Sequence, residues 1–137
     1  MDELTRKTYE LRSDIIDEVY QSKAGHVGGD LSVIDILTVL YYKVMDITPE
    51  NFSERNRDHF LLSKGHCVDA LYMVLGDLGF FDEEEAKKTF SAYGSRYIGH
   101  PNTEVPGIEI NSGSLGHGMA LGVGMALAGK MDGMDYR

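Results

Sequence analysis

Apolar residues recur at helical spacing along the first two-thirds of the chain, and this periodicity limits the possible folds more than any other feature. One stripe is formed by Leu4, Leu11, Ile15 and Val19. It predicts an amphipathic helix over residues 3–22, with Asp2 as its N-cap and Gly25 just beyond its end.

The next apolar segment is predicted to be a buried helix. Ser32 and Asp35 have the spacing of a capping box, and the residues that follow, up to Leu40, are apolar around nearly the whole helical circumference. Thr48 and Pro49 then have the residue types of an N-cap and a first helical position, which predicts a short turn there.

The chain from residue 60 to residue 90 contains one candidate strand and two further helices. Phe60–Leu62 is the best strand candidate, because a short apolar run is flanked by charged residues. A buried helix is predicted over residues 66–78 and is stopped by Gly79. Asp82 and Glu85 then cap a short acidic helix that ends near residue 90.

Two later segments are unusual. Residues 92–113 fit neither a helical nor a strand period, and a stretch of this kind in a compact domain is more often functional than idle. Residues 115–130 have helical length but many small residues, which favours either tight helix packing or close approach of a ligand to the helix N-terminus. A phosphate-binding loop over residues 124–130 is rejected, because Met131 stands where Mg²⁺ requires Ser or Thr.

Composition narrows the function further. The 137 residues suit one domain, and no apolar run approaches the roughly 18 residues of a membrane span. The net charge of −9 argues against a nucleic-acid partner. A single cysteine, Cys67, excludes an internal disulfide, and the acidic start lacks the features of a signal peptide, so we expect a cytoplasmic protein. Cys67 begins an apolar helix and is interpreted as a packing residue.

Four of the five histidines directly follow a glycine, at positions 26, 66, 100 and 117. A glycine before a functional side chain allows positive φ or a close approach of the backbone to a ligand. Imidazole is the side chain whose charge changes most readily near neutral pH. The chain therefore presents histidines on loops. Zinc binding by His26, His66 and His100 is a weak alternative, because these three lack helical i, i+4 pairing and there is only one cysteine.

Four segments resemble, in order and spacing, the N-terminal portion of transketolase: Lys23–Gly29, Arg57–His66, Gly99–Pro101 and Ser112–Gly118. The Ser-Leu-Gly-His-Gly form of the last segment is similar to that of transketolases split into two subunits. The resemblance implies an α/β fold of the three-layer αβα thiamine diphosphate-binding type. Residues 1–137 would form part of that N-terminal domain, the helix-rich opening part with few strands.

The family transfers a two-carbon ketol unit from a ketose phosphate to an aldose phosphate by means of thiamine diphosphate. By resemblance, His66 lies near the diphosphate and the reacting carbon, His100 bonds the hydroxyls of the adduct, and His26 assists proton transfer. These histidines would be the catalytic residues. Cofactor binding is implied for His66, Gly113, Ser114 and Leu115. Such roles suit imidazole, which can donate a proton or a hydrogen bond to a developing alkoxide.

The family binds Mg²⁺ through a Gly-Asp-Gly segment and a later Asn, and both would follow residue 137, so no metal ligand is assigned here. The resemblance implies a C-terminal transketolase subunit or domain as partner, sugar phosphates as substrates, and a homo- or hetero-oligomer. We expect the chain to be inactive alone and to expose apolar surface. Two alternatives stay open: a non-catalytic remnant or assembly module, and part of another thiamine diphosphate-dependent ketol transferase.

Overall fold

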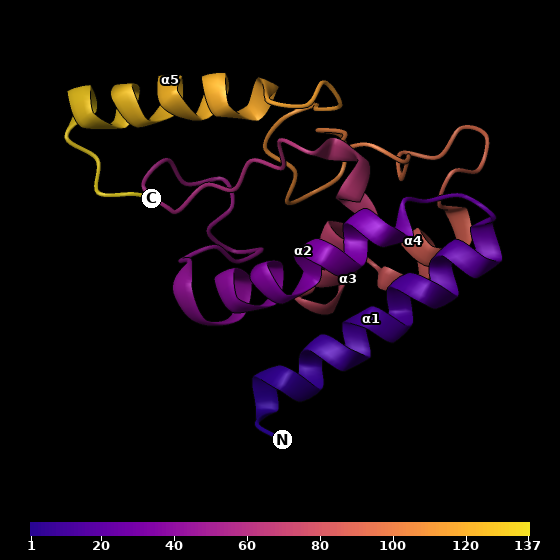
Figure 1. Ribbon diagram of the computed structural model, residues 1–137. Helices are drawn as coiled ribbons and strands as arrows, with labels where there is room; N and C mark the ends of the chain where they lie inside the picture. The colour runs from indigo at the N-terminus through magenta and orange to yellow at the C-terminus, as the bar shows by residue number, and fades with distance from the viewer.

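The computed structural model describes residues 1–137 and is built from helices joined by irregular loops, with no β-strand (Figure 1). The elements are α1 (Glu3–Ser22), α2 (Val27–Val39), the π-helical turn η1 (Leu40–Val44), the 3₁₀ turn η2 (Gly65–Cys67), α3 (Val68–Asp77), α4 (Glu83–Thr89) and α5 (His117–Asp132). None of these helices has both the length and the apolar composition needed to cross a membrane.

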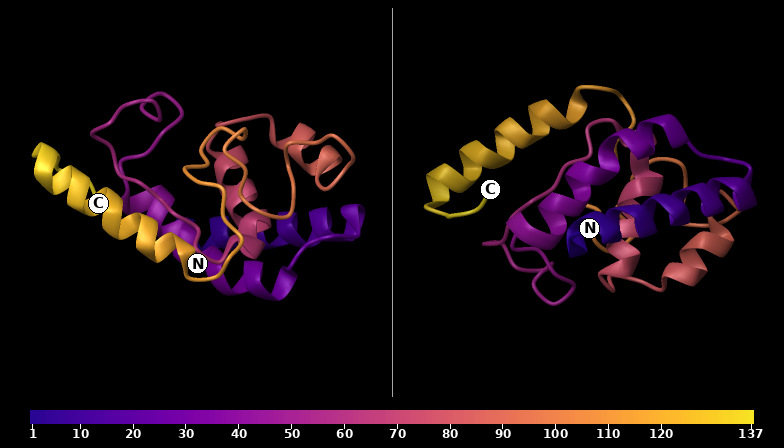
Figure 2. Two further views of the ribbon diagram at one scale, coloured as in Figure 1. Left: turned by 90° about the horizontal axis from the view of Figure 1, so that it is seen from above. Right: turned by 60° about the horizontal axis from the view of Figure 1, so that its bottom comes forward.

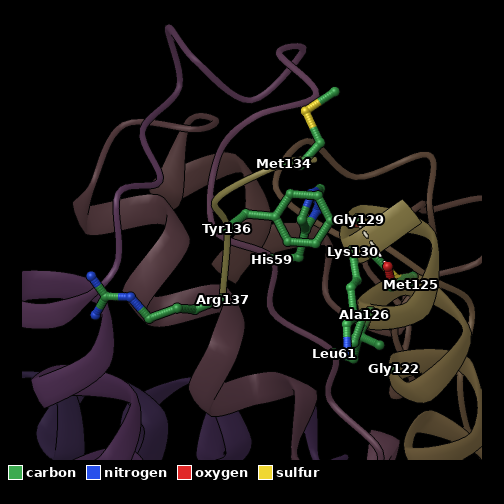
Figure 3. Close-up of a pocket in the computed structure, with 10 residues that line it drawn as sticks. All are labelled: His59, Leu61, Gly122, Met125, Ala126, Gly129, Lys130, Met134, Tyr136 and Arg137. Atoms are coloured by element: carbon green, nitrogen blue, oxygen red, sulfur yellow. Dashed lines mark hydrogen bonds between the residues drawn. The ribbon is translucent and has the colours of Figure 1, made fainter. Parts of the chain in front are cut away.

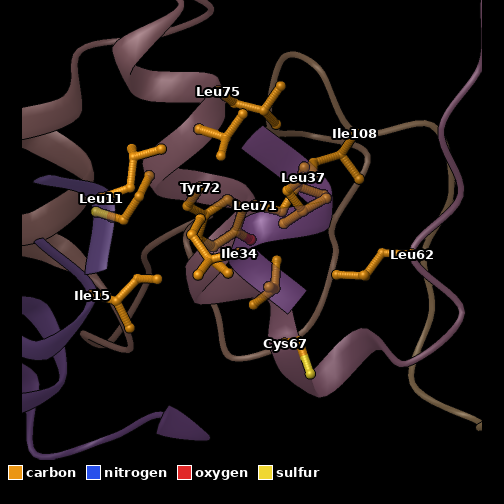
Figure 4. Packing of buried hydrophobic residues seen from close by; sticks show 14 of the residues in the cluster. Leu11, Ile15, Ile34, Leu37, Leu62, Cys67, Leu71, Tyr72, Leu75 and Ile108 are labelled. Carbon is orange, nitrogen blue, oxygen red and sulfur yellow. The ribbon is translucent and has the colours of Figure 1, made fainter. Parts of the chain in front are cut away.

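Helices α1, α2 and α3 pack against one another, and α4 packs on α1 and α3. We call α1 to α4 the helical body. Its core gathers apolar side chains from these helices and from the loops beside them, including Leu62 and Ile108 (Figure 4). Every residue of α3 from Val68 to Gly76 is buried, which confirms the buried helix predicted there.

Helix α5 lies along one side of the molecule, separate from α1 (Figures 1 and 2). Only Gly118 and Gly129 are buried in it. Large apolar side chains are exposed along its length: Met119, Leu121, Val123, Leu127 and Met131. The expectation of exposed apolar surface is confirmed at this helix.

The predicted caps of α1 and α4 are confirmed. The Asp2 carboxylate accepts a hydrogen bond from the Thr5 amide at 2.8 Å, and Asp82 accepts one from the Glu85 amide at 3.0 Å. Helix α1 spans Glu3–Ser22, as the sequence predicts, and Lys23 with φ of 57° is its C-cap. The turn at residue 48 is also present, because the Thr48 amide donates to Asn51 Oδ1 at 2.8 Å.

The capping box proposed for the second helix is wrong. Helix α2 begins at Val27, so Ser32 lies inside it, and the Ser32 hydroxyl donates back to the Gly29 carbonyl at 2.8 Å. The expected burial is only partly right, because Ile36 is 57% exposed and Val39 is 44% exposed. No neighbouring element covers the outer side of this helix.

The predicted strand at Phe60–Leu62 is also wrong. The segment is irregular because no second segment forms a hydrogen-bonded ladder along it, and a strand needs such a neighbour. Pairing occurs only at its start, where the His59 amide donates to the Arg137 carbonyl at 2.9 Å. By contrast, the prediction that residues 92–113 are neither helix nor strand is confirmed. The last helix is shifted by two residues, to His117–Asp132.

Candidate active site

Three of the predicted histidines meet in space. The ring centroids of His26 and His66 are 5.3 Å apart, and those of His26 and His100 are 6.0 Å apart. His26 directly precedes α2, His66 lies in η2, and His100 lies in the irregular segment between α4 and α5. We call these three residues the histidine cluster. Its members come from three separate loops, so only the tertiary fold brings them together.

Glycines allow the backbone to lie against this cluster. A Cβ atom at Gly29 would lie 3.3 Å from the His66 ring and 2.6 Å from Cys67 Sγ. One at Gly113 would lie 3.2 Å from His100 Cδ2. The structure thus brings the predicted cofactor residue Gly113 to His100.

The glycines that directly precede the histidines divide into two kinds. Gly25 has φ of +127° and Gly116 has φ of +88°, and a Cβ atom at Gly65 would lie 2.9 Å from the Ser112 backbone. At Gly99 nothing lies within 4 Å of such an atom and φ is not positive. Positive φ therefore requires glycine at positions 25 and 116, and tight packing against Ser112 requires it at position 65, but neither reason applies at Gly99.

Hydrogen bonds from side chains join the loops that hold the cluster. The Tyr72 hydroxyl, on α3, contacts the carbonyls of Ile98 and His100 at 3.3 and 3.5 Å. The Ser112 hydroxyl donates to the Leu62 carbonyl at 2.7 Å. Lys64 Nζ donates to the Ser32 hydroxyl at 3.0 Å and places a positive charge beside α2.

Three buried carboxyl groups lie behind the cluster: Glu18 on α1, Asp30 on α2 and Asp69 on α3. Asp69 Oδ2 accepts a hydrogen bond from the His26 amide at 3.3 Å. Burial, together with the charge of Asp30, raises the pKa of Asp69 to about 7. Burial also raises the pKa of Glu18 to about 9, with Asp69 and Asp30 adding to the effect. These acids were not identified from the sequence. Their signal was available, since Asp69 interrupts an apolar helix and Glu18 lies on the apolar stripe of α1.

The other candidate residues lie outside the described contacts of the cluster. Ser114 and Leu115 are exposed just before α5, and their cofactor roles stay predictions. His59 instead contacts the Glu109 carboxylate at 3.1 Å and the Tyr136 ring. Cys67 is fully buried, and burial raises the pKa of its thiol, so its assignment as a packing residue is confirmed.

A cavity of about 370 Å³ lies between α5 and residues 59–61, and none of the three clustered histidines lines it (Figure 3). The Tyr136 ring lies over Gly129 there, and its hydroxyl donates to the Met125 carbonyl at 2.8 Å. The cavity is therefore bordered by the contacts that hold the C-terminal residues to α5, and it is a separate feature from the histidine cluster.

Comparison with known proteins identifies the family of this chain and structures that share its fold. Residues 5–137 match the family model for the thiamine diphosphate-binding domain of transketolase. Transketolase structures share the fold: that from Leishmania mexicana superposes with a TM-score of 0.87 at 32% identity, covering 93% of this chain and 19% of its own. That from Campylobacter jejuni gives 0.82 at 36% identity, covering 95% and 21%. The predicted fold class is confirmed, with this chain as its helix-rich opening part.

The chain belongs to the transketolase thiamine diphosphate-binding domain family. It is 49% identical over 136 residues to a subunit of the apulose-4-phosphate transketolase of Phocaeicola vulgatus, and 38% identical over 134 residues to the corresponding subunit from Actinobacillus succinogenes. Each match covers 96% of this chain and 48% of the relative, so the chain spans about half the length of these proteins.

The described residues fit one of the family's two ligands. Gly29 lies beside the His66 ring and Gly113 beside the His100 ring, so neither position places a side chain over these imidazoles, which suits an organic cofactor. For Mg²⁺ the fit fails, since no group of three or more His, Cys, Asp or Glu side chains could hold a metal ion.

Proposed function

We propose that this chain is the N-terminal subunit, or part of it, of a transketolase that moves a two-carbon ketol unit from a ketose phosphate to an aldose phosphate. The observation that carries the proposal is the histidine cluster, in which three imidazoles from separate loops lie with ring centroids 5.3 and 6.0 Å apart. Membership of the transketolase thiamine diphosphate-binding domain family indicates the reaction for which such a cluster is suited.

Thiamine diphosphate, when bound, supplies the carbon nucleophile of this reaction. The chain's own residues then have three tasks. His66, together with Gly113, Ser114 and Leu115, would hold the cofactor. His100 donates a hydrogen bond to substrate hydroxyls. His26 holds or delivers a proton at the substrate oxygen, as an imidazole can near neutral pH.

The proposal requires a second polypeptide or a further domain. The Mg²⁺ ligands are assigned to residues outside 1–137, since the described residues offer no metal-binding group. A C-terminal transketolase subunit is the proposed partner, because the relatives at 49% and 38% identity are themselves named as single subunits of a transketolase. The exposed apolar face of α5 gives a surface that such an assembly can cover. We place the protein in the cytoplasm, as expected from its single cysteine.

The substrate class is a further part of the proposal. Apulose 4-phosphate is the first candidate, because the relative at 49% identity is named for it. A second candidate comes from a relative at 39% identity over 123 residues, the 6-deoxy-6-sulfo-D-fructose transketolase subunit SqwG of a Clostridium species. The two differ in the charged group at the end of the sugar, so a direct assay separates them.

The test mixes the chain with a candidate C-terminal subunit, thiamine diphosphate and Mg²⁺, and measures ketol transfer from each sugar. We expect activity only in the complete mixture, and a loss of at least about 100-fold for His66→Asn. His59→Asn is the matched control, because His59 lies outside the cluster. If no thiamine diphosphate binding is found by calorimetry in the complete mixture, the chain is a non-catalytic assembly module and the proposal fails.

A further inference from the structure

The carboxyl groups of Glu18, Asp30 and Asp69 are almost completely removed from solvent, with exposed fractions of 1%, 0% and 0%. No lysine or arginine forms an ion pair with any of them. Lys87 is the cation that acts on Glu18, but its ammonium group is already paired with Asp14 and Glu83. Burying several unpaired carboxylates together costs free energy, so protons must neutralise some of these three carboxyl groups.

The hydrogen bonds of Asp69 and Asp30 leave one oxygen of each group without a donor. Asp69 Oδ2 accepts from the His26 amide, and Asp30 Oδ1 accepts from the Ala70 amide at 3.4 Å. The second oxygen of each group, Asp69 Oδ1 and Asp30 Oδ2, is buried without a donor. Burial raises the pKa of both aspartates, and the negative charge of Asp30 adds to the effect at Asp69. One proton held by the two groups removes one of the two buried charges.

The same arrangement holds the backbone of His26. Its amide is bound by Asp69, and its carbonyl accepts from the Gly29 amide at 2.8 Å and from the Asp30 amide at 3.1 Å. A Cβ atom at Gly25 would lie 2.5 Å from Asp69 Oδ2, so the chain before His26 lies directly against this carboxyl group. His26 has no side-chain capping bond, so the hydrogen bonds that hold this residue are those of its backbone.

We propose that Asp69 is a positioning residue for His26: it shares one proton with Asp30 and, through its other oxygen, holds the His26 amide in the geometry of the histidine cluster. Loss of that proton leaves two adjacent buried carboxylates that repel each other, and the His26 loop shifts. An effect of this loop shift on catalysis rests on the proposed function. The coupling of residue 26 to the Asp30–Asp69 pair does not.

Other titratable groups face the pair, and the test must separate them. They are Glu18 from α1, Tyr72 from α3, Cys67 from the 3₁₀ turn, Lys64 from the loop before that turn, and the His26 imidazole. Lys87 from α4 acts on Glu18. The His26 imidazole is the main difficulty, because it belongs to the residue whose amide the test follows.

The experiment follows the amide proton and nitrogen shifts of residue 26 by NMR from pH 5 to 9, in the full chain carrying His26→Gln. This substitution removes the imidazole titration but keeps the amide. We expect an inflection near pH 7. It disappears when Asp69→Asn is added. It moves at least about one pH unit lower with Asp30→Asn, since a neighbouring negative charge is lost.

Asp17→Asn is the matched control, since Asp17 neighbours Glu18 in sequence but is exposed and forms no ion pair, and it leaves the inflection unchanged. An inflection that persists unchanged in the Asp69 and Asp30 variants, or none in the His26→Gln chain, overturns the proposal. If Asp69→Asn does not fold, the Asp30 variant decides. A chain with the inflection that binds no thiamine diphosphate keeps this inference and loses the proposed function, so the two failures are distinguishable.

Discussion

Helices α3 and α5 are both apolar, yet the fold treats them in opposite ways. In α3 every residue from Val68 to Gly76 is buried, whereas in α5 only Gly118 and Gly129 are. The first lies between neighbouring helices, and the second presents Leu127 and Met131 to solvent. Apolar composition therefore predicts that a helix will be buried, but the elements packed around it determine whether this chain buries it.

The contacts that hold α5 are few and depend on small residues near its two ends. A Cβ atom at Gly118 would lie 2.8 Å from the Ser63 side chain, and one at Gly129 would lie 2.5 Å from the Tyr136 ring. At Gly124, in the middle of the helix, nothing lies within 4 Å. Tight packing thus accounts for the glycines near the two ends, whereas Gly124 in the middle faces outward.

The largest difference between the two regions is expected from truncation of one leucine in each. Leu37→Ala, in the core of the helical body, lowers the free energy of unfolding by about 2 to 5 kcal/mol because it leaves a cavity. Leu127→Ala, on the exposed face of α5, changes it by less than about 0.5 kcal/mol. Urea unfolding followed by circular dichroism measures both. Equal losses would show that α5 is as well packed as the body.

The buried acids of the body make its stability depend on pH. The folded-state pKa of Asp69 is about 7 and that of Glu18 about 9, both above their ordinary values of 3.8 and 4.5. Between these limits the folded state binds more protons than the unfolded chain, so stability falls as pH rises from about 4 to 9. Each of the two groups lowers the free energy of unfolding by about 1.4 kcal/mol for every pH unit between its ordinary and its folded-state pKa.

Urea unfolding at pH 5, 7 and 9 tests this dependence. Glu18→Gln removes a titrating group, so it should abolish the part of the loss between pH 7 and 9, whereas the exposed Asp17→Asn should leave it unchanged. Stability that rises toward pH 9 in the unmodified chain would contradict the assignment of raised pKa values to these acids.

A substitution at Gly25 tests the contact between the body and the histidine cluster. Gly25→Ala lowers the free energy of unfolding by about 1 to 3 kcal/mol, because φ of +127° is strained for alanine and its Cβ atom would meet Asp69. Gly28→Ala, three residues on, has open space and should be neutral or stabilising. Thermal unfolding measures both variants, and equal effects would mean that the loop before α2 adapts freely.

Local signals in the sequence were sufficient for much of the helical body. Asp2 and Asp82 act through residues three positions away, so the caps of α1 and α4 could be predicted. The strand at Phe60–Leu62 could not be judged in this way, because a strand depends on a neighbour distant in sequence. The start of α2 was misplaced because the glycines at 28 and 29 resemble a loop, although the helix includes them.

The candidate site shows the same division. The histidines at 26, 66 and 100 were found from motifs, because each motif is local even though their meeting is not. Asp30 and Asp69 were missed, because their importance lies in a pairing between residues of different helices. A charged residue inside an apolar helix indicates burial, but only the packed fold identifies its neighbour.

The smallest expected effect concerns the centre of α5. Gly124→Ala raises the free energy of unfolding by about 0.5 to 1 kcal/mol, because alanine is the better helix former and its Cβ atom meets nothing within 4 Å. Gly129→Ala, on the same helix, should be destabilising because its Cβ atom would lie 2.5 Å from the Tyr136 ring. Thermal unfolding of the two variants separates them by sign. If Gly124→Ala is destabilising instead, the middle of α5 is in close contact with another molecule in solution. Helix α5 is then buried by a second chain, whereas α3 is buried by the other helices of its own chain.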